Sequence, residues 1–304
     1  MPLNKVPPLA RRGDPDWYTD AKSWPNGSHS EFWRVGQFVW HIQRRGDGPV
    51  MLLIHGTGAA THSWAPLVEI LHRQFTTISV DLPGHGFTRS PRNFRPTLTN
   101  ISTALTALLS DMDICPTSVV GHSAGAAIAV SMVARRELAP SSLVSINGAL
   151  KPFEGPMQII APTIAKAATF GGLAARMVSR NSSGPSQIRN LISSIGSDPD
   201  KVDVTSYASL LQRHGHIQGA LSMMANWDLT SVLYDCTQIE QPILFIAGGN
   251  DLAVAPDISK HAAGRAPNGA YFEIDGVGHL AHEENPEAVA DIIVCELARL
   301  TTSN

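Results

Sequence analysis

The chain has 304 residues, of which 43% are hydrophobic and 16% charged, and its formal net charge is −3. This composition can fill a large core and excludes a disordered chain, and the slightly negative charge argues against a nucleic-acid partner. The length fits one large α/β domain with an insertion as well as it fits two domains.

The three cysteines, Cys115, Cys236 and Cys295, are far apart and show no Cys-x-x-Cys spacing. This pattern argues against a disulfide framework and a zinc site, and it is compatible with a reducing cytosol. The N-terminal residues lack the apolar segment of a signal peptide. No apolar run reaches the roughly 18 residues that a membrane span needs. We therefore expect a cytoplasmic protein without a transmembrane segment, and peripheral membrane contact stays open.

The first 30 residues are rich in Pro, Gly, Asp and Trp without clear periodicity, which predicts an irregular arm. A hairpin is predicted over residues 32–43, where side chains alternate with period two around Gly36-Gln37. Further predicted elements are strands at 50–54, 76–80, 118–120, 143–146, 243–247 and 270–274, and helices at 64–73, 97–112, 124–136 and 287–299. Strands that alternate with helices predict a mostly parallel central sheet flanked by helices.

Between residues 148 and 241 this alternation stops, and no convincing strand is found. The stretch far exceeds the ~2–6 residues of ordinary loops in α/β units, so it needs structure of its own. We predict a helical cap over residues 150–236, inserted after the sixth strand, and a core made of residues 1–149 and 237–304. The cap is expected at the carboxyl edge of the sheet, where α/β proteins bind ligands.

The strongest motif is Gly121-His122-Ser123-Ala124-Gly125, which lies between a predicted strand and a predicted helix. A G-x-S-x-G sequence in this position is typical of a nucleophile elbow, a strained turn that lifts the serine hydroxyl above the sheet. The flanking glycines leave room where larger side chains would collide. The helix N-terminus also favours negative charge at the serine. We therefore predict Ser123 as a nucleophile.

A serine hydroxyl needs a base and an acid that orients the base. His279 follows the last predicted strand on a glycine-rich loop, and Asp251 lies just past the strand at 243–247. Serine, aspartate and histidine then follow one another in an order known from serine hydrolases. Asn147 ends the preceding strand, where some hydrolases place their acid, but an amide carries no negative charge. We therefore predict His279 as the base and Asp251 as the acid.

The segment His55-Gly56-Thr57-Gly58 directly follows the strand at 50–54. Acyl transfer builds negative charge on a carbonyl oxygen, which needs hydrogen-bond donors that are already in place. We predict the backbone amides of Thr57 and Ala124 as these donors, with Gly58 as the alternative to Thr57. His55 is interpreted as a scaffold residue that hydrogen-bonds the loop.

Apolar side chains of the cap suggest an apolar substrate or ligand, although they could equally form a small core of the cap itself. His122 is expected to face away from the reaction, but as a neighbour of the serine it is kept as a candidate. The candidate substrate-binding residues are Gly58, His122, Phe153, Met157, Met223, Met224 and Trp227.

Two other features of the chain carry no predicted chemistry. Asp81 and His85 lie on a glycine-rich loop after the strand at 76–80, and both are interpreted as loop architecture. There is no P-loop motif, and no G-x-G-x-x-G follows the first strand. We therefore expect neither a cofactor nor a metal ion in the chemistry.

From about Trp33 to Leu300 the chain resembles the α/β-hydrolase superfamily through the motifs above. The segments 53–64, 81–88, 121–127 and 147–153, with Pro15-Asp16-Trp17 and Trp24-Pro25-Asn26, look like the magnesium-chelatase accessory proteins of bacteriochlorophyll biosynthesis. The resemblance implies a phototrophic bacterium, a porphyrin-type ligand and magnesium-chelatase subunits as candidate partners. Magnesium chelation is driven by an ATPase, and this chain has no nucleotide motif, so an assisting role is implied.

Three hypotheses follow for the function. The first is a working serine hydrolase that acts on an ester, and the second is a non-catalytic porphyrin-binding or chaperone protein that keeps a hydrolase framework. The third is the same triad used for C–C bond hydrolysis or for cofactor-free haloperoxidase chemistry. Dehalogenation is disfavoured because its nucleophile would be an aspartate. Fold and triad do not by themselves set the substrate.

Overall fold

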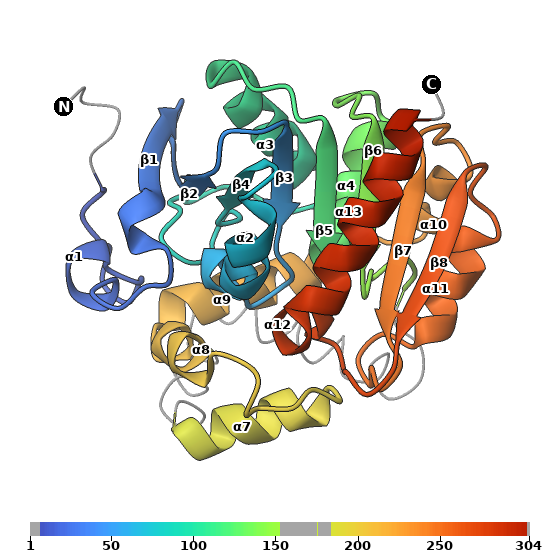
Figure 1. Cartoon of the computed structure of the whole chain (residues 1–304). Coiled ribbons are helices and arrows are strands. Elements are labelled where there is room, and N and C mark those ends of the chain that lie inside the picture. The colour runs from blue at the N-terminus through green and yellow to red at the C-terminus, as the bar shows by residue number, and fades with distance from the viewer. Residues whose placement is uncertain (1–6, 153–174, 176–183, 303–304) are drawn as a thin grey trace.

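The computed structural model describes residues 7–152, 175 and 184–302 (Figure 1). Eight strands form one sheet: β1 (Ser30–Val35), β2 (Phe38–Arg45), β3 (Val50–Ile54), β4 (Thr76–Val80), β5 (Ser118–His122), β6 (Ser142–Ile146), β7 (Ile243–Gly248) and β8 (Gly269–Ile274). Their order across the sheet is β1-β2-β4-β3-β5-β6-β7-β8. Only the pairs β1–β2 and β2–β4 are antiparallel, which confirms the prediction of a mostly parallel sheet.

The central strands are apolar because both faces of the sheet are covered. Every residue of β5, β6 and β7 is buried, as expected for parallel strands between helical layers. The prediction located β3 and β4 with their observed bounds. It ended β5 two residues early, because Gly121 and His122 are poor strand formers. Their pairing with Ser145 and Ile146 of β6 nevertheless extends the strand to the serine.

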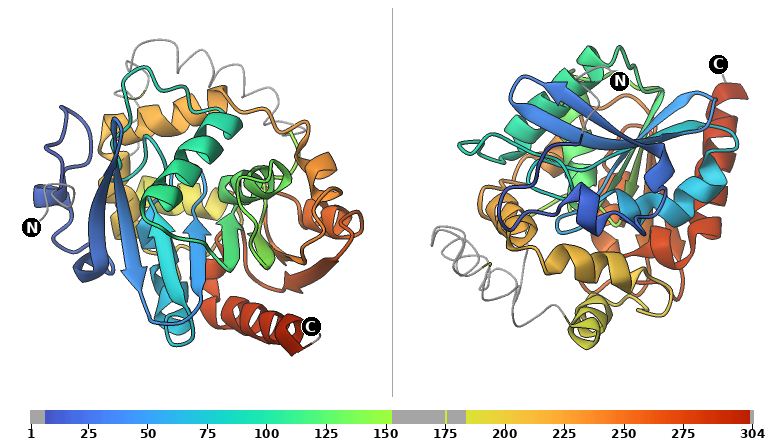
Figure 2. Two further views of the ribbon diagram at one scale, coloured as in Figure 1. Left: turned by 90° about the horizontal axis from the view of Figure 1, so that it is seen from above. Right: turned by 90° about the vertical axis from the view of Figure 1, so that its left-hand side faces the viewer.

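Helices cover both faces of the sheet (Figure 2). One layer packs into the larger core cluster, and the other packs into a second cluster on the opposite face. The first layer contains α3 (Leu98–Asp111), α4 (Ala124–Ala134), α10 (Val232–Cys236) and α11 (Pro256–Ala263), and the second contains α2 (Ala65–Leu71) and α13 (Pro286–Thr302). No helix was predicted at α11, which has only eight residues.

The N-terminal arm is mostly irregular but well packed. It contains one helical turn, α1 (Trp17–Asp20), and a short 3-10 turn, η2 (Gly27–His29). The rings of Trp17 and Trp24 contact Phe87 edge to face, at centroid distances of 5.0 and 4.9 Å. These aromatic contacts fasten the arm to the loop that follows β4.

The long stretch between β6 and β7 is helical in its described part. Residues 184–241 contain α7 (Pro185–Ser194), α8 (Val204–Leu211), α9 (His214–Ala225) and α10, and no strand. In Figure 1, α7, α8 and α9 lie beyond the carboxyl ends of the parallel strands. Val232 and Cys236 of α10 belong instead to the main core cluster. The division into a core and a cap over residues 150–236 stays a prediction.

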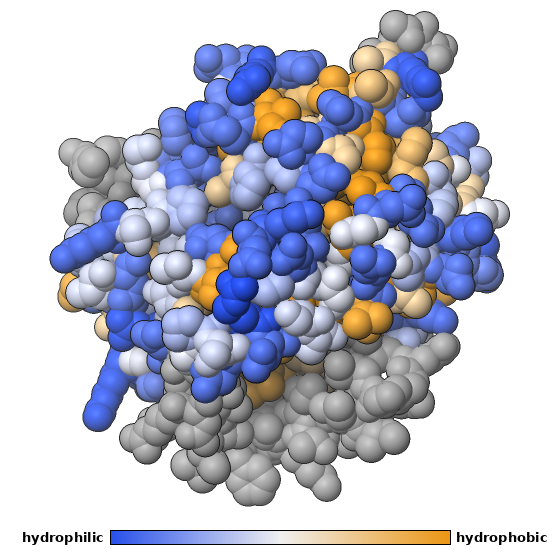
Figure 3. Space-filling view, turned by 60° about the horizontal axis from the view of Figure 1, so that its bottom comes forward, coloured by the Kyte–Doolittle hydropathy of each residue, from blue (hydrophilic) through white to orange (hydrophobic). Residues whose placement is uncertain are grey.

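Hydrophilic side chains cover much of the described surface on the face seen in Figure 3, with apolar residues between them. The large exposed apolar residues of the described ranges are spread along the sequence, and single residues of this kind are common on proteins. They are Leu9, Tyr18, Leu191, Tyr234 and Leu252. Across the described ranges, no helix is long and apolar enough to cross a membrane.

Candidate functional site

Ser123 occupies a strained turn between β5 and α4. Its backbone lies at φ 50° and ψ −114°, an unusual conformation for a residue with a side chain. A Cβ atom on Gly125 would lie 1.9 Å from the carbonyl oxygen of Ile54, and one on Gly121 would lie 2.4 Å from the amide of Ala126. Only glycine fits at both positions, so the motif permits the turn that the sequence predicted.

The structure brings the three predicted residues of the triad together. His279 Nδ1 lies 2.8 Å from Asp251 Oδ2, and His279 Nε2 lies 3.0 Å from Ser123 Oγ. A carboxylate only accepts hydrogen bonds, so Nδ1 carries the proton that binds Asp251. Nε2 is then free to accept the Ser123 hydroxyl proton, which is the arrangement that a general base needs.

Four donors surround the Asp251 carboxylate. Oδ1 accepts from the amides of Ala253 at 2.8 Å and Val254 at 2.9 Å. Oδ2 accepts from Asn147 Nδ2 at 2.7 Å, in addition to His279. Asn147 follows β6 at a position where some hydrolases carry their acid, but here it is a buried donor to Asp251. Its place at the end of β6, beside β7, was the signal for this contact.

The side chain of His122 contacts the backbone of His279 and makes no hydrogen bond to the hydroxyl of Ser123. Its Nε2 donates to the carbonyl oxygen of His279 at 2.9 Å, and the residue is only 2% exposed. Burial, together with the neighbouring His282 and His279 rings, holds the pKa of His122 well below its ordinary value. His122 therefore braces the backbone of His279, in keeping with the expectation that it faces away from the reaction.

The loop after β3 runs past the serine. A Cβ on Gly56 would lie 3.0 Å from Ser123 Cβ, and the Ala59 amide donates to the Gly56 carbonyl to close a turn. His55 accepts from the Leu82 amide through Nε2 and donates through Nδ1 to the Gly56 carbonyl. The scaffold role predicted for His55 agrees with these bonds. The loop thus brings Thr57 and Gly58 to the side of Ser123.

The predicted pocket residues are only partly brought to this loop. Met223 is completely buried, and its Sδ lies 3.9 Å from Thr57 Oγ1. Met224 is half-buried, and Trp227 is partly buried against the main core. Phe153 and Met157 lie outside the described residues.

The stretch between β6 and β7, called the insert below, contacts the loops that carry Asp251 and His279. These contacts were not predicted from the sequence. The Ile195 carbonyl accepts from the amides of Leu252 at 3.2 Å and His279 at 3.3 Å. Ser197 Oγ accepts from the amide of Leu280 at 2.9 Å. One short segment after α7 therefore holds the loops that carry both Asp251 and His279. No motif signals such contacts, because they depend on how the insert docks.

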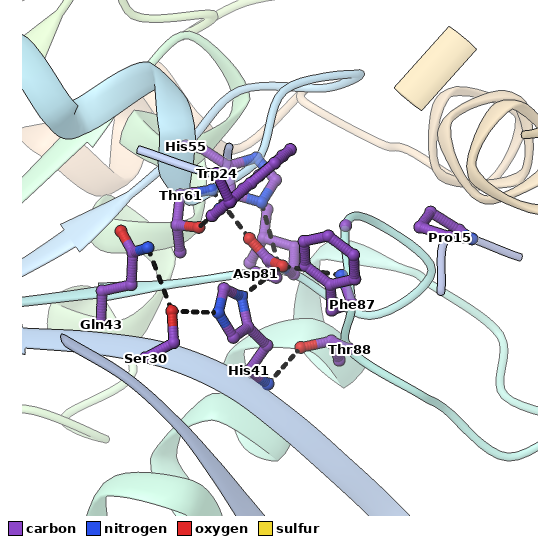
Figure 4. A network of polar contacts seen from close by, with 12 residues as sticks. Pro15, Trp24, Ser30, His41, Gln43, His55, Thr61, Asp81, Phe87 and Thr88 are labelled. Atoms are coloured by element: carbon purple, nitrogen blue, oxygen red, sulfur yellow. Dashed lines mark hydrogen bonds and ion pairs between the residues drawn. The ribbon is translucent and has the colours of Figure 1, made fainter. Parts of the chain in front are cut away.

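A buried polar network centred on Asp81 fixes the loop after β4 (Figure 4). The carboxylate accepts from His41 Nδ1 at 2.7 Å and from the amides of Thr61 and Phe87 at 2.7 and 2.8 Å. Burial alone would raise the pKa of Asp81, but His41 and these donors hold it well below its ordinary value. These bonds join β2, the loop after β3 and the loop after β4, and they agree with the interpretation of Asp81 as loop architecture.

A second buried network lies next to His122. Tyr207 OH of α8 and Ser63 Oγ each donate to Glu283 Oε1 at 2.7 Å. His282 Nε2 donates to Ser63 Oγ at 2.8 Å, and its ring centroid lies 4.4 Å from that of His122. Burial raises the pKa of Glu283 to about 8, against the two hydrogen bonds, which favour the charged form. Glu283 is therefore largely protonated at neutral pH.

Replacing Glu283 with glutamine is expected to stabilise the protein above pH 4.5. The folded state keeps a proton that the unfolded chain loses, so wild-type stability falls as the pH rises from about 4.5 to about 8. Each pH unit corresponds to about 1.4 kcal/mol. The free energy of unfolding of Glu283→Gln should exceed that of wild type by a few kcal/mol at pH 8 and match it near pH 4.5.

Urea unfolding at several pH values measures this gap. The matched control is Glu287→Gln, which changes an exposed carboxyl at the start of α13. A gap for Glu283→Gln that does not grow with pH would contradict a protonated, buried Glu283.

All three cysteines are free, with Cys115 and Cys295 exposed and Cys236 buried. Burial raises the pKa of the Cys236 thiol to about 12, which keeps it unreactive. Within the described ranges, no group of three or more His, Cys, Asp or Glu side chains is arranged to hold a metal ion.

Comparison with known proteins identifies relatives along most of the chain. Residues 49–286 match the family model described as "alpha/beta hydrolase fold". The chain is 34% identical to the magnesium-chelatase 30 kDa subunit of Rhodobacter capsulatus, over 90% of this chain and 95% of that protein. It is 27% identical to the pimeloyl-[acyl-carrier protein] methyl ester esterase of Xanthomonas campestris, over 83% of this chain and 96% of the esterase.

Solved structures with a similar backbone include the enol-lactonase of Burkholderia xenovorans, with a TM-score of 0.70 and 21% identity, covering 88% of this chain and 99% of that one. The haloalkane dehalogenase of Bradyrhizobium elkani has a TM-score of 0.75 and 19% identity, covering 90% and 99%. At these identities the likeness concerns the fold. The match of residues 49–286 to the family model shows that the chain belongs to the α/β-hydrolase family.

Proposed function

We propose that the chain is a serine hydrolase that cleaves an ester of an apolar compound. The observation that carries this proposal is the continuous line of hydrogen bonds from Asp251 through His279 to Ser123. The strained backbone of Ser123 supports it, because such strain is typical of nucleophile elbows. The similarity to a methyl ester esterase is in keeping with an ester substrate.

In the first half of the proposed reaction, Ser123 Oγ bonds to the ester carbonyl carbon while its proton moves to His279 Nε2. The carbonyl electron pair moves onto the oxygen, where the amides of Thr57 and Ala124 would stabilise the charge. Asp251 stabilises the imidazolium and does not itself take the proton. The tetrahedral intermediate then collapses, and the alcohol leaves with the proton from His279.

In the second half, a water molecule gives a proton to His279 Nε2 and its oxygen bonds to the acyl carbon. The new intermediate expels Ser123 Oγ, which recovers the proton from His279. The products are one carboxylic acid and one alcohol, and the enzyme returns to its starting state. No cofactor or external electron donor enters this cycle.

Side chains near the loop after β3 (residues 55–60, called the oxyanion loop below) favour an apolar substrate. Met223 packs at Thr57, and Met224 follows on the same helix. Methionine adapts to irregular apolar surfaces, which suits a bulky ligand. We place the substrate between α9 and the end of β5, where the cap is predicted to cover the serine.

Turnover of esters tests this function. Purified protein is assayed with p-nitrophenyl esters of rising chain length and with a protoporphyrin methyl ester. We expect saturable hydrolysis. We also expect activity to stop once a serine-reactive reagent has modified one serine per molecule. The absence of turnover on every ester would contradict the proposal.

A second candidate function is non-catalytic binding of a porphyrin in support of magnesium chelatase. The 34% identity to a magnesium-chelatase subunit favours it. Under this hypothesis Ser123→Ala binds protoporphyrin as wild type does and still stimulates reconstituted chelatase. Loss of stimulation in a folded Ser123→Ala variant would favour the catalytic function instead.

A further inference from the structure

Helix α9 lies on the loop that carries the proposed oxyanion donors, and His216 joins the two. We propose that His216 is a positioning residue that holds Thr57 and Gly58 in the orientation that oxyanion stabilisation requires. This inference rests on the proposed function. It adds that the oxyanion loop keeps its shape only while α9 is docked.

Both ring nitrogens of His216 make hydrogen bonds, one to the loop after β3 and one to the loop after β4. Nε2 lies 3.0 Å from the Gly58 carbonyl oxygen, and Nδ1 lies 3.1 Å from the Gly86 amide nitrogen. The Gly86 amide can only donate, so Nδ1 accepts and Nε2 carries the proton that binds Gly58. The ring is 1% exposed, and its burial lowers the pKa of His216 to about 4. It is therefore neutral under physiological conditions, as these two bonds require.

The bond to Gly58 bears directly on the proposed oxyanion donors. Gly58 has a φ of +81°, a backbone conformation that residues with side chains rarely adopt. Gly58 directly follows Thr57, whose amide is a proposed donor. The Gly58 carbonyl shares its peptide plane with the Ala59 amide, which donates to the Gly56 carbonyl oxygen at 3.2 Å. A hydrogen bond that fixes the Gly58 carbonyl therefore also fixes the turn that contains Thr57.

Other contacts of α9 converge on the same loops. Met223, two turns after His216, contacts the Thr57 hydroxyl. The backbones of Gly219 and Gly84 approach so closely that a Cβ on Gly219 would lie 1.9 Å from the Gly84 carbonyl oxygen. This close approach fixes the position of α9. Through its bond to Gly58, His216 makes the conformation of the oxyanion loop depend on that position.

Oxyanion donors act on charge that develops in the transition state, not on the bound substrate. Weakening the bond between His216 and Gly58 should therefore lower kcat and leave KM largely unchanged. A purely structural role for His216, in holding α9 to the loop after β4, depends instead on the bond to Gly86. The two bonds can be separated, because they use different ring nitrogens.

His216→Gln and His216→Asn form a matched pair of variants. The glutamine amide nitrogen takes the place of ring Nε2 and keeps the donor to Gly58. The asparagine amide oxygen takes the place of ring Nδ1 and keeps only the acceptor for Gly86. We expect kcat of His216→Gln to stay within about threefold of wild type. For His216→Asn we expect kcat to fall by about 10- to 100-fold at unchanged KM. This is less than the roughly 10²- to 10³-fold cost of removing an oxyanion donor, because the donors are misplaced and not removed.

Amide hydrogen exchange over residues 56–60 gives a second readout that needs no catalysis. We expect faster exchange in His216→Asn than in His216→Gln, with the rest of the chain unchanged. Equal exchange in the two variants, or equal kcat values where wild type is active, would overturn the role of His216. If wild type hydrolyses no ester but the exchange rates differ as expected, the positioning role stands and the proposed hydrolase function fails.

Discussion

Replacing Ser123 with alanine is expected to lower kcat for ester hydrolysis by about 10³- to 10⁶-fold. The loss follows because no other hydroxyl among the described residues lies within hydrogen-bond distance of His279 Nε2. Alanine keeps the Cβ atom and the backbone of the elbow, so stability should change little. Steady-state kinetics on the best ester, with thermal unfolding of both proteins, measures the two effects.

The matched control is Ser131→Ala, which removes a buried hydroxyl two turns further along α4. It should keep wild-type kcat. Full activity in Ser123→Ala would show that another group performs the chemistry, and would contradict the proposed nucleophile.

Replacing Asp251 with asparagine is expected to lower kcat by about 10⁴-fold at nearly constant structure. The carboxylate accepts from four N–H groups, and an amide can accept only through its oxygen. The two backbone amides of Ala253 and Val254 should retain that oxygen. The new NH2 group then faces His279 Nδ1, which must lose its proton in order to accept.

That change of tautomer is the reason for the loss. His279 would carry its proton on Nε2 and donate to Ser123, so it could no longer act as a base. Asn147 could adapt, because its Oδ1 has no hydrogen-bond partner within the described ranges and can turn to accept from the new amide.

Kinetics together with the low-field NMR signal of the His279 Nδ1 proton measures the effect. We expect the signal in wild type and its loss in Asp251→Asn. The control is Asp275→Asn, an exposed carboxyl on the loop before His279. A retained signal alongside wild-type kcat in Asp251→Asn would contradict the role of the acid.

The sequence was sufficient to predict that Ser123, Asp251 and His279 lie close together, because each one follows the end of a strand. Carboxyl ends of parallel strands meet at one edge of a sheet, so Ser123, Asp251 and His279 come together although they are far apart along the chain. The alternation of strands and helices similarly predicted the sheet. The pattern missed α11 because that helix is short. It missed the last residues of β5 because they include a glycine.

The residues that brace the site could not be predicted in the same way. Asn147, His216 and the Ile195 carbonyl act through contacts between segments whose docking no periodicity encodes. Glu283 also looks like an ordinary surface carboxyl in the sequence, because charged residues are rarely buried. Its burial becomes evident only when Tyr207 of α8 is seen to cover it.

Labelling with a fluorophosphonate probe reports whether Ser123 is activated, because the probe reacts selectively with activated serines. Intact-protein and peptide mass spectrometry locate the adduct. We predict a single adduct on Ser123 of wild type and none on the folded Ser123→Ala variant. A folded wild-type protein that takes up no probe, or an adduct that persists in Ser123→Ala, would contradict the claim that Asp251 and His279 activate this serine.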